Sequence, residues 1–208
     1  MSVKDNSLVE KFKTALTSTA KVISDDLQLN ENNKKKTDNS INIEIDNLTK
    51  PSDFIKLRAE TDSVALKKKF SNKDIYKNNL PTNPSSRSLY KIAEKIRYEC
   101  LGGKMLKGIE KNFNENYKEI INRTRKEKLR NKEDVAVTEA FELYMLKNFH
   151  HIELNTLTRR MLNFWEKDFE KSIDKHKKFL QDNLDNQQQY SSRFSKILEE
   201  MDIFQNED

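Results

Sequence analysis

The sequence predicts a mainly α-helical protein, a bundle of about six to seven helices with one short strand near residues 41–46. Two observations predict this class. The 208 residues include only three glycines and three prolines, whereas a sheet protein of this length needs many turns. In several long segments the apolar residues also recur three or four positions apart, which is the spacing of a helix that buries one face.

The first fifty residues predict a helix followed by a linker. Residues 7–27 have a helical apolar pattern, carried by Leu8, Phe12, Leu16, Ala20 and Ile23. Residues 30–40 are polar and rich in Lys and Asn, which is typical of a linker. The alternation in 41–45 suits a short strand. We therefore expect an N-terminal helix over 1–28, a polar linker with the strand over 29–50, and a helical domain over 51–208.

The helical domain divides at its prolines and glycines. We expect helices over Pro51–Phe70, from a cap at Ser85, Ser86 or Ser88 through Leu89 to Cys100, from Leu106 to Ile121, from Glu133 to Phe149, from Asn155 to Leu184, and from Tyr190 to Met201. All three glycines lie close together, at Gly102, Gly103 and Gly108. They predict a tight turn between two helices, with a positive φ at one of them.

The composition excludes several classes of protein. No apolar run approaches the roughly 18 residues that a membrane span needs, and residues 1–13 lack the apolar core of a signal peptide, so we expect a cytoplasmic protein. The single cysteine, Cys100, excludes an internal disulfide framework and a cysteine-based zinc cage. With 35% hydrophobic residues, the core is modest.

No motif in the chain predicts catalysis or metal binding. The segment Gly103 to Gly108 resembles a phosphate-binding loop only superficially, because Ile and Glu follow the second glycine where that motif has Lys and then Ser or Thr. His150 and His151 are adjacent, so their side chains would diverge by about 100° on a helix and could not hold one metal ion together. We expect both, and His176, at the surface. No catalytic residue, metal ligand or bound cofactor is therefore assigned.

One basic segment leaves a second function open. Six of the eleven residues in 122–132 are Lys or Arg, so this segment could contact a phosphate backbone. However, the chain has 39 basic and 34 acidic residues, and a net charge of +5 gives only a weak electrostatic attraction for nucleic acid. A helical protein that binds nucleic acid, or a structural interaction protein, through segment 122–132 is therefore the less favoured alternative function.

Two blocks of sequence resemble the N-terminal region of the T subunit of aerobic cobaltochelatase, the CobT family. The first block runs from Arg58 to Leu66 and is similar to the family's Arg-Gly-x-Ala-Asp-x-x-Ala-Leu, with Ala59 in place of the glycine. Its matching residues are Arg58, Asp62, Ala65 and Leu66. The second is similar to Glu-x-x-Arg-x-Glu-x-x-Gly followed by Gly and Asn, and its matching residues are Glu94, Arg97, Glu99, Gly102, Gly108 and Asn112. Arg97 and Glu99 lie beside an apolar stripe. The sequence leaves two alternatives for them, a buried or interface ion pair and an ordinary solvated pair.

A third block is looser. Trp165 stands at the family's Trp-Arg-Pro-Trp position, but Glu166 and Lys167 replace Arg and Pro. Asn186-Gln187-Gln-Gln-Tyr190 is similar to the family's Asp-Gln-x-x-Phe. We expect Trp165 to anchor the core rather than to stack on a ligand.

The resemblance implies a role in cobalamin biosynthesis. In the family the T subunit assembles with an AAA+ ATPase subunit (S), and this pair drives a large N subunit that inserts cobalt into hydrogenobyrinic acid a,c-diamide. ATP, magnesium and cobalt are used by the partners, so the resemblance implies a non-catalytic subunit that forms homo-oligomers. The family's T subunit continues through an acidic linker into a von Willebrand factor A domain with an Asp-x-Ser-x-Ser metal site, which this chain lacks. We expect either an N-terminal fragment or a shortened subunit.

Overall fold

A computed structural model describes residues 3–25, 48, 50–122 and 129–201. Within these ranges the protein is mainly α-helical, as the sequence predicts, and contains nine α-helices and one 3₁₀ helix. The predicted linker and the strand near 41–46 lie outside the described residues.

The helices between residues 51 and 121, and those between residues 137 and 199, follow one another with short connections. Their bounds are α1 Val3–Ile23, α2 Pro51–Phe70, α3 Lys73–Asn78, α4 Pro84–Met105, α5 Lys107–Ile121, the 3₁₀ helix Lys132–Asp134, α6 Val137–Phe149, α7 Thr156–Asn163, α8 Glu166–Asp182 and α9 Gln187–Glu199. The prolines act as helix starters, because Pro51 and Pro84 occupy the first turns of α2 and α4, where no backbone N–H is needed.

The predicted course of one helix and the predicted cap of another differ from the structure. The helix predicted over 155–184 is broken at Phe164 and Trp165, because the Trp165 indole Nε1 donates to the Val135 carbonyl at 3.0 Å and anchors the chain where α7 and α8 meet. The cap of α4 is Asn83, whose side chain accepts from the N–H groups of Ser85 and Ser86, and not one of the predicted serines. Asn83 directly precedes Pro84, the first residue of α4, so its side chain lies next to the N–H groups of the first turn.

The glycines do not form the predicted left-handed turn. Gly102 and Gly103 lie inside α4, Gly108 lies in the first turn of α5, and no described glycine has a positive φ. The two helices join at Leu106, whose backbone is extended with φ of −142° and ψ of 119°. An extended residue is enough to turn the chain here, so the absence of a side chain at Gly102 must serve another purpose than the turn.

That purpose is a close approach of two helices. A Cβ added at Gly102 would lie 2.7 Å from Cδ2 of Leu66 and closer still to Cδ1, whereas one added at Gly108 would meet nothing within 4 Å. Leu66 is fully buried. Gly102 therefore lets α4 pack directly on α2, while Gly108 serves no comparable contact.

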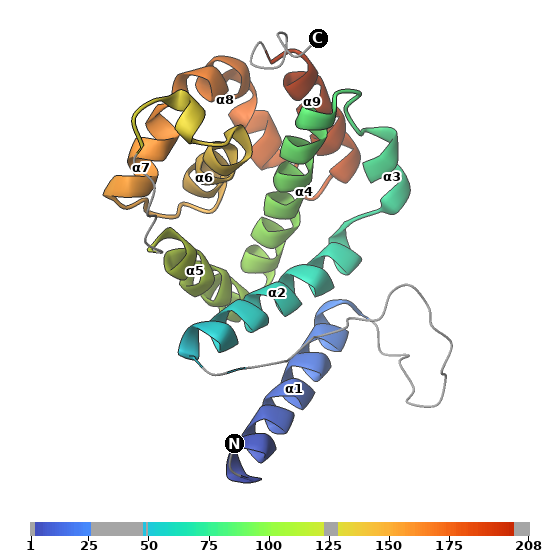
Figure 1. Cartoon of the computed structure of the whole chain (residues 1–208). Helices are drawn as coiled ribbons and strands as arrows, with labels where there is room; N and C mark the ends of the chain where they lie inside the picture. Colours follow the sequence, from blue (N-terminus) through green and yellow to red (C-terminus); the bar gives the residue numbers. More distant parts are fainter. Residues whose placement is uncertain (1–2, 26–47, 49, 123–128, 202–208) are drawn as a thin grey trace.

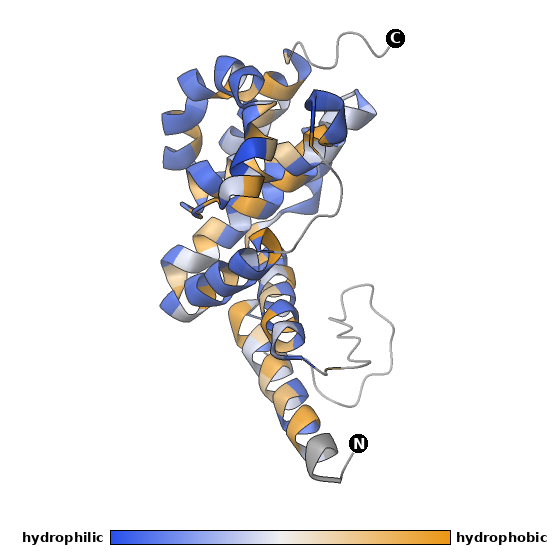
Figure 2. Cartoon of the chain, turned by 60° about the vertical axis from the view of Figure 1, so that its left-hand side comes forward, coloured by the Kyte–Doolittle hydropathy of each residue, from blue (hydrophilic) through white to orange (hydrophobic). Residues whose placement is uncertain are grey.

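Helix α4 is the centre of the fold. It packs against α2, α5, α6 and α9, and Figure 1 shows it running between α2 and the C-terminal helices. Its buried apolar face includes Leu89, Ala93 and Ile96, which belong to one continuous hydrophobic core. By contrast, α1 packs mainly on α2 and extends away from the other helices, as Figure 2 shows.

The end of α6 turns the chain sharply. His151 has a φ of 56°, in the left-handed region, and the Ile152 N–H donates to the Leu146 carbonyl at 3.1 Å. Glycine is the usual residue at a left-handed position that follows a helix, and here a histidine adopts that backbone. The turn leaves His151 exposed and directs the preceding side chain, His150, into the interior.

We predict that Gly102→Ala lowers the free energy of unfolding by about 1–3 kcal/mol, because the new methyl group overpacks the contact with Leu66. Gly108→Ala is the matched control. It should raise stability by up to ~1 kcal/mol, because alanine favours the helix and the space is open. Urea denaturation of both variants measures the difference, and equal effects would show that α4 and α2 do not touch at Gly102.

Candidate functional site

Most residues that carry the family resemblance lie on α4 and on two helices that pack against it, α2 and α5. Three of them, Glu94, Arg97 and Glu99, belong to two buried polar clusters. The first, here called the Arg97 cluster, consists of Glu94, Arg97, Gln187 and Ser191. The second, the Glu99 cluster, consists of Ser63, Glu99, Tyr117 and His150. Both glutamates and Arg97 are at most 2% exposed, which is unusual for charged side chains.

In the Arg97 cluster the guanidinium is surrounded by acceptors. Its Nε donates to Glu94 Oε2 at 3.3 Å, and its Nη1 donates to the Leu184 carbonyl at 2.9 Å. Its Nη2 donates to the Phe70 carbonyl at 2.6 Å and to Ser71 Oγ at 3.3 Å. Arg97 thus ties α4 to the end of α2 and to the segment after α8, where free backbone carbonyls need donors.

Glu94 completes the cluster from the other side. Its Oε1 accepts from Ser191 Oγ at 2.6 Å, and its Oε2 accepts from Gln187 Nε2 at 3.2 Å. Gln187 in turn accepts from the Asn72 N–H at 2.7 Å. These contacts bind α9 to α4 and to the start of α3. A buried charge pair is tolerated only with such full hydrogen bonding.

The Glu99 cluster joins a different set of elements. Glu99 Oε1 accepts from Ser63 Oγ of α2 at 2.6 Å, and Oε2 accepts from the Tyr117 hydroxyl of α5 at 2.5 Å. His150 Nε2, just after α6, lies 3.6 Å from Oε2. That separation is an ion-pair contact and is too long for a hydrogen bond. One carboxylate therefore connects α2, α4, α5 and the end of α6.

Electrostatics favour a charged pair in this cluster. Burial alone would raise the pKa of Glu99, but the contacts with His150, Lys95 and Ser63 outweigh it and lower the pKa of this carboxyl. Burial opposes the charged form of His150, yet the neighbouring Cys100 and Glu99 side chains raise its pKa to about 9. At neutral pH the pair is therefore Glu99 carboxylate with His150 imidazolium.

A third polar contact lies between α2 and α5. Asn112 Nδ2 donates to Asp62 Oδ2 at 2.6 Å. Burial raises the pKa of Asp62, whereas Asn112 and the charge of Arg58 oppose this rise. Arg58 itself is exposed and lies over the Phe12 ring of α1, 5.8 Å from its centroid.

The remaining residues of the resemblance are uncharged, and they pack in the core or, in one case, have free space beside them. Ala65 and Leu66 are fully buried on α2, and Gly102 packs on Leu66 as described above. Gly108 lies on α5 with free space beside it. Trp165 is partly buried against the core, stacks on Phe169, and carries the Lys132 ammonium 4.1 Å from its ring centroid.

The structure changes two of the sequence interpretations. Arg97 and Glu99 both lie in the interior, but they do not pair with each other, because residues two apart on a helix point in different directions. The expectation that His150 lies at the surface is wrong, since its side chain is only 8% exposed. The left-handed turn at His151, which no residue type in the sequence signals, is what brings His150 inward.

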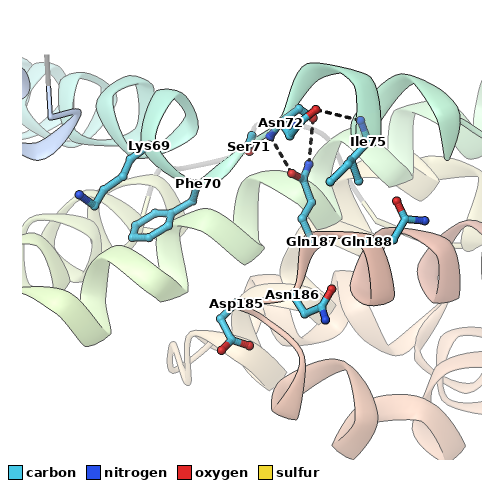
Figure 3. A pocket seen from close by; sticks show the side chains of 9 residues that line it. All are labelled: Lys69, Phe70, Ser71, Asn72, Ile75, Asp185, Asn186, Gln187 and Gln188. Atoms are coloured by element: carbon cyan, nitrogen blue, oxygen red, sulfur yellow. Dashed lines mark hydrogen bonds between the residues drawn. The ribbon is translucent and has the colours of Figure 1, made fainter.

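A shallow pocket of about 690 Å³ opens beside the Arg97 cluster. Figure 3 shows it between the α2–α3 connection and the α8–α9 connection, with the Gln187 side chain bonded to Asn72 at one edge. Its lining residues are Lys69, Phe70, Ser71, Asn72, Ile75, Asp185, Asn186, Gln187 and Gln188. The Arg97 guanidinium bonds the Phe70 carbonyl and Ser71 hydroxyl from the interior side, so the charge does not reach the pocket as a free donor.

The basic segment 122–132 is held at its end. Residues 123–128 lie outside the described part of the chain. Lys132 pairs with Asp168 at 2.7 Å, and Arg160 Nη2 donates to the Leu129 carbonyl at 2.8 Å. One of the six cations that suggested nucleic-acid binding is therefore engaged within the protein.

Within residues 3–25, 50–122 and 129–201, no three His, Cys, Asp or Glu side chains are grouped so that they could hold a metal ion. No helix in these same ranges combines the length and the apolar character that crossing a bilayer requires.

Comparison with known proteins gives one match. Residues 6–208 match the family model described as "Cobalamin biosynthesis protein CobT", which covers nearly the whole chain. No curated protein and no solved structure matched the chain.

We predict that Arg97→Met destabilises the protein by about 3–5 kcal/mol, because it leaves the Glu94 carboxylate buried without its cation. The double variant Arg97→Met/Glu94→Gln should recover part of this loss, since glutamine is uncharged and its oxygen still accepts a hydrogen bond from Ser191 or Gln187. Lys91→Met, at an exposed position of α4, is the control and should change stability by less than about 0.5 kcal/mol. If urea denaturation gives equal values for Arg97→Met and Lys91→Met, the Arg97 cluster contributes no stability.

We also predict that stability falls as pH rises from about 6.5 to about 9. The pKa of His150 is raised in the folded protein to about 9, so the pair with Glu99 stabilises fully below the ordinary histidine value of 6.5, and this stabilisation is lost as pH rises through 9. The maximum slope for one group is about 1.4 kcal/mol per pH unit. The measurement is the free energy of unfolding against pH for the wild type and for His150→Gln, which should remove this slope. His151→Asn is the control: asparagine tolerates the left-handed backbone, so this variant should keep the slope of the wild type. An unchanged slope in His150→Gln would contradict the assignment of the slope to His150.

Proposed function

The chain belongs to the CobT family of cobalamin biosynthesis proteins, and from this premise we propose that it is a non-catalytic helical component that assembles with an AAA+ ATPase of the cobaltochelatase system. One observation carries the proposal. The three buried charged residues of the second family block, Glu94, Arg97 and Glu99, are hydrogen-bonded to other parts of the same chain. Groups occupied in this way hold helices together and are not available to a substrate.

The kind of contacts supports this interpretation. A catalytic carboxylate must reach a substrate proton or a reacting atom, and its side chain lies within hydrogen-bonding distance of that atom in a cleft. Glu94 and Glu99 lie under packed helices instead, each at most 2% exposed, with hydroxyl and amide donors from neighbouring elements. Their position supports a structural role for the blocks.

In this proposal the chemistry belongs to the partners. The resemblance implies that an ATPase subunit hydrolyses ATP with magnesium and that a large N subunit inserts cobalt, which is a substrate, into hydrogenobyrinic acid a,c-diamide. The chain would link the two by its helical surfaces and would also form homo-oligomers. Several apolar side chains lie exposed on the described helices and could bury against partners: Leu8, Val22, Val64, Met105, Leu106 and Ile120.

The test is co-expression of the full chain with the S-type ATPase, followed by size-exclusion chromatography with light scattering. We predict a stable complex that elutes as one species, together with a mass for the isolated chain above that of a monomer. Gly108→Ala, which the structure leaves without a new contact, is the control for correct folding and should assemble like the wild type. Separate elution of chain and ATPase at micromolar concentration would contradict the assembly role.

A second measurement tests the non-catalytic part. Cobalt insertion is followed with the N and S subunits, ATP and magnesium, in the presence and absence of the chain. We expect no insertion by the chain alone and a rate that depends on adding it to the other two. Insertion of cobalt by the isolated chain would overturn the proposal.

A further inference from the structure

A second cleft, of about 330 Å³, lies between α8 and α9 and shares no residue with the two buried clusters. It is formed by His176 of α8 and by one face of α9 from Gln189 to Glu200. Its volume is at the lower end of the range of small-ligand sites, which is roughly 300–1,000 Å³. The cleft is thus large enough for a small charged group.

Arg193 lies in the wall of this cleft and forms no ion pair with any carboxylate in the part of the chain that the structure describes. Its guanidinium carbon lies 4.6 Å from the centroid of the Phe179 ring, a cation–π contact. Its Nη1 lies 3.3 Å from Nδ1 of His176. Burial and the charges of Arg193 and Lys175 lower the pKa of His176, so at neutral pH its ring is neutral and Nδ1 accepts the hydrogen bond.

Arg193 differs from Arg97 in how many of its nitrogens already donate hydrogen bonds within the protein. Arg97 uses Nε, Nη1 and Nη2 in hydrogen bonds to four acceptors. Arg193 uses only Nη1 within the described part of the chain, which leaves Nε and Nη2 free to donate. The ring of Phe179 and the nitrogen of His176 hold the guanidinium in place, so the entropic cost of ordering a long side chain has already been met before a ligand arrives.

The surroundings of Arg193 favour a negative ligand. Lys196 lies one helical turn further along α9 and, among the residues that the structure describes, has no ion-pair partner. Ser192 and Gln189 add a hydroxyl and an amide to the lining. Glu200 supplies the one negative charge, so the ionised side chains of the cleft carry a net charge of +1.

We propose that this cleft binds an oxyanion, the carboxylate or phosphate group of a small ligand, with the free Nε and Nη2 of Arg193 as a two-pronged donor and Lys196 as a second cation. Parallel N–H groups of a guanidinium match two oxygens of a carboxylate or phosphate, and such charge-assisted bonds are stronger than neutral ones. This site goes beyond the assembly role and does not depend on it.

The experiment is an NMR titration of the full-length ¹⁵N-labelled chain with sodium phosphate and, separately, with sodium acetate, at constant ionic strength. We expect saturable shifts of the Gln189 and Ser192 amides and of the Arg193 Nε–H. Arg193→Gln should weaken binding by at least about tenfold, because it removes the two-pronged donor. Tighter binding of phosphate or of acetate identifies which oxyanion the cleft prefers, and either result supports the site.

Controls separate a built site from a general charge effect. Arg159→Gln removes the same charge from an exposed position of α7 and should leave the affinity unchanged. Lys196→Gln provides a second variant in the cleft if Arg193→Gln does not fold, and should weaken binding less. Non-saturable shifts, or an equal loss of affinity in Arg159→Gln and the cleft variants, would overturn the proposal.

Discussion

The burial of a single arginine, Arg97, is the constraint on which the packing of the helical domain depends. A guanidinium cannot be neutralised by losing its proton at any ordinary pH, so its charge must be met by acceptors wherever it lies. In this fold the acceptors come from Glu94 and from backbone carbonyls at Phe70 and Leu184, which belong to separate segments. The ends of α2 and α8 are therefore placed where their carbonyls can reach one side chain of α4.

The same principle extends along α4 to Glu99. Glu94 and Arg97 face α9 and the end of α2, whereas Glu99 faces α2, α5 and the turn after α6. Each cluster combines a charge pair with hydroxyl or amide donors, so neither carboxylate is left unsatisfied. Apolar packing alone would allow helices to slide past one another, and directional bonds to fixed partners restrict this sliding. A central helix with two such clusters defines the positions of its neighbours.

Much of the fold could be predicted from the sequence, because helices of this protein have one regular apolar face. The extent of α2 and its start at Pro51 follow from local rules. The site could be predicted only in part. Arg97 and Glu99 were visible as charges beside an apolar stripe, but their partners lie far along the chain, as with Ser191 and His150. The break at Trp165 depends on a tertiary contact with Val135, and no residue type signals the left-handed backbone at His151.

The way in which the family blocks are buried also restricts where a partner can bind. Arg97 is fully buried and donates four hydrogen bonds within the chain, and Glu99 lies beneath Tyr117 and His150. A partner that needed these groups would first have to separate α4 from its neighbours, with the loss of several charge-assisted bonds. Recognition must therefore use the outer faces of the helices, which the blocks position but do not form. In such an arrangement the residues of the family blocks define the scaffold, and partly buried residues near its surface, such as Arg193, are the ones placed to contact a ligand.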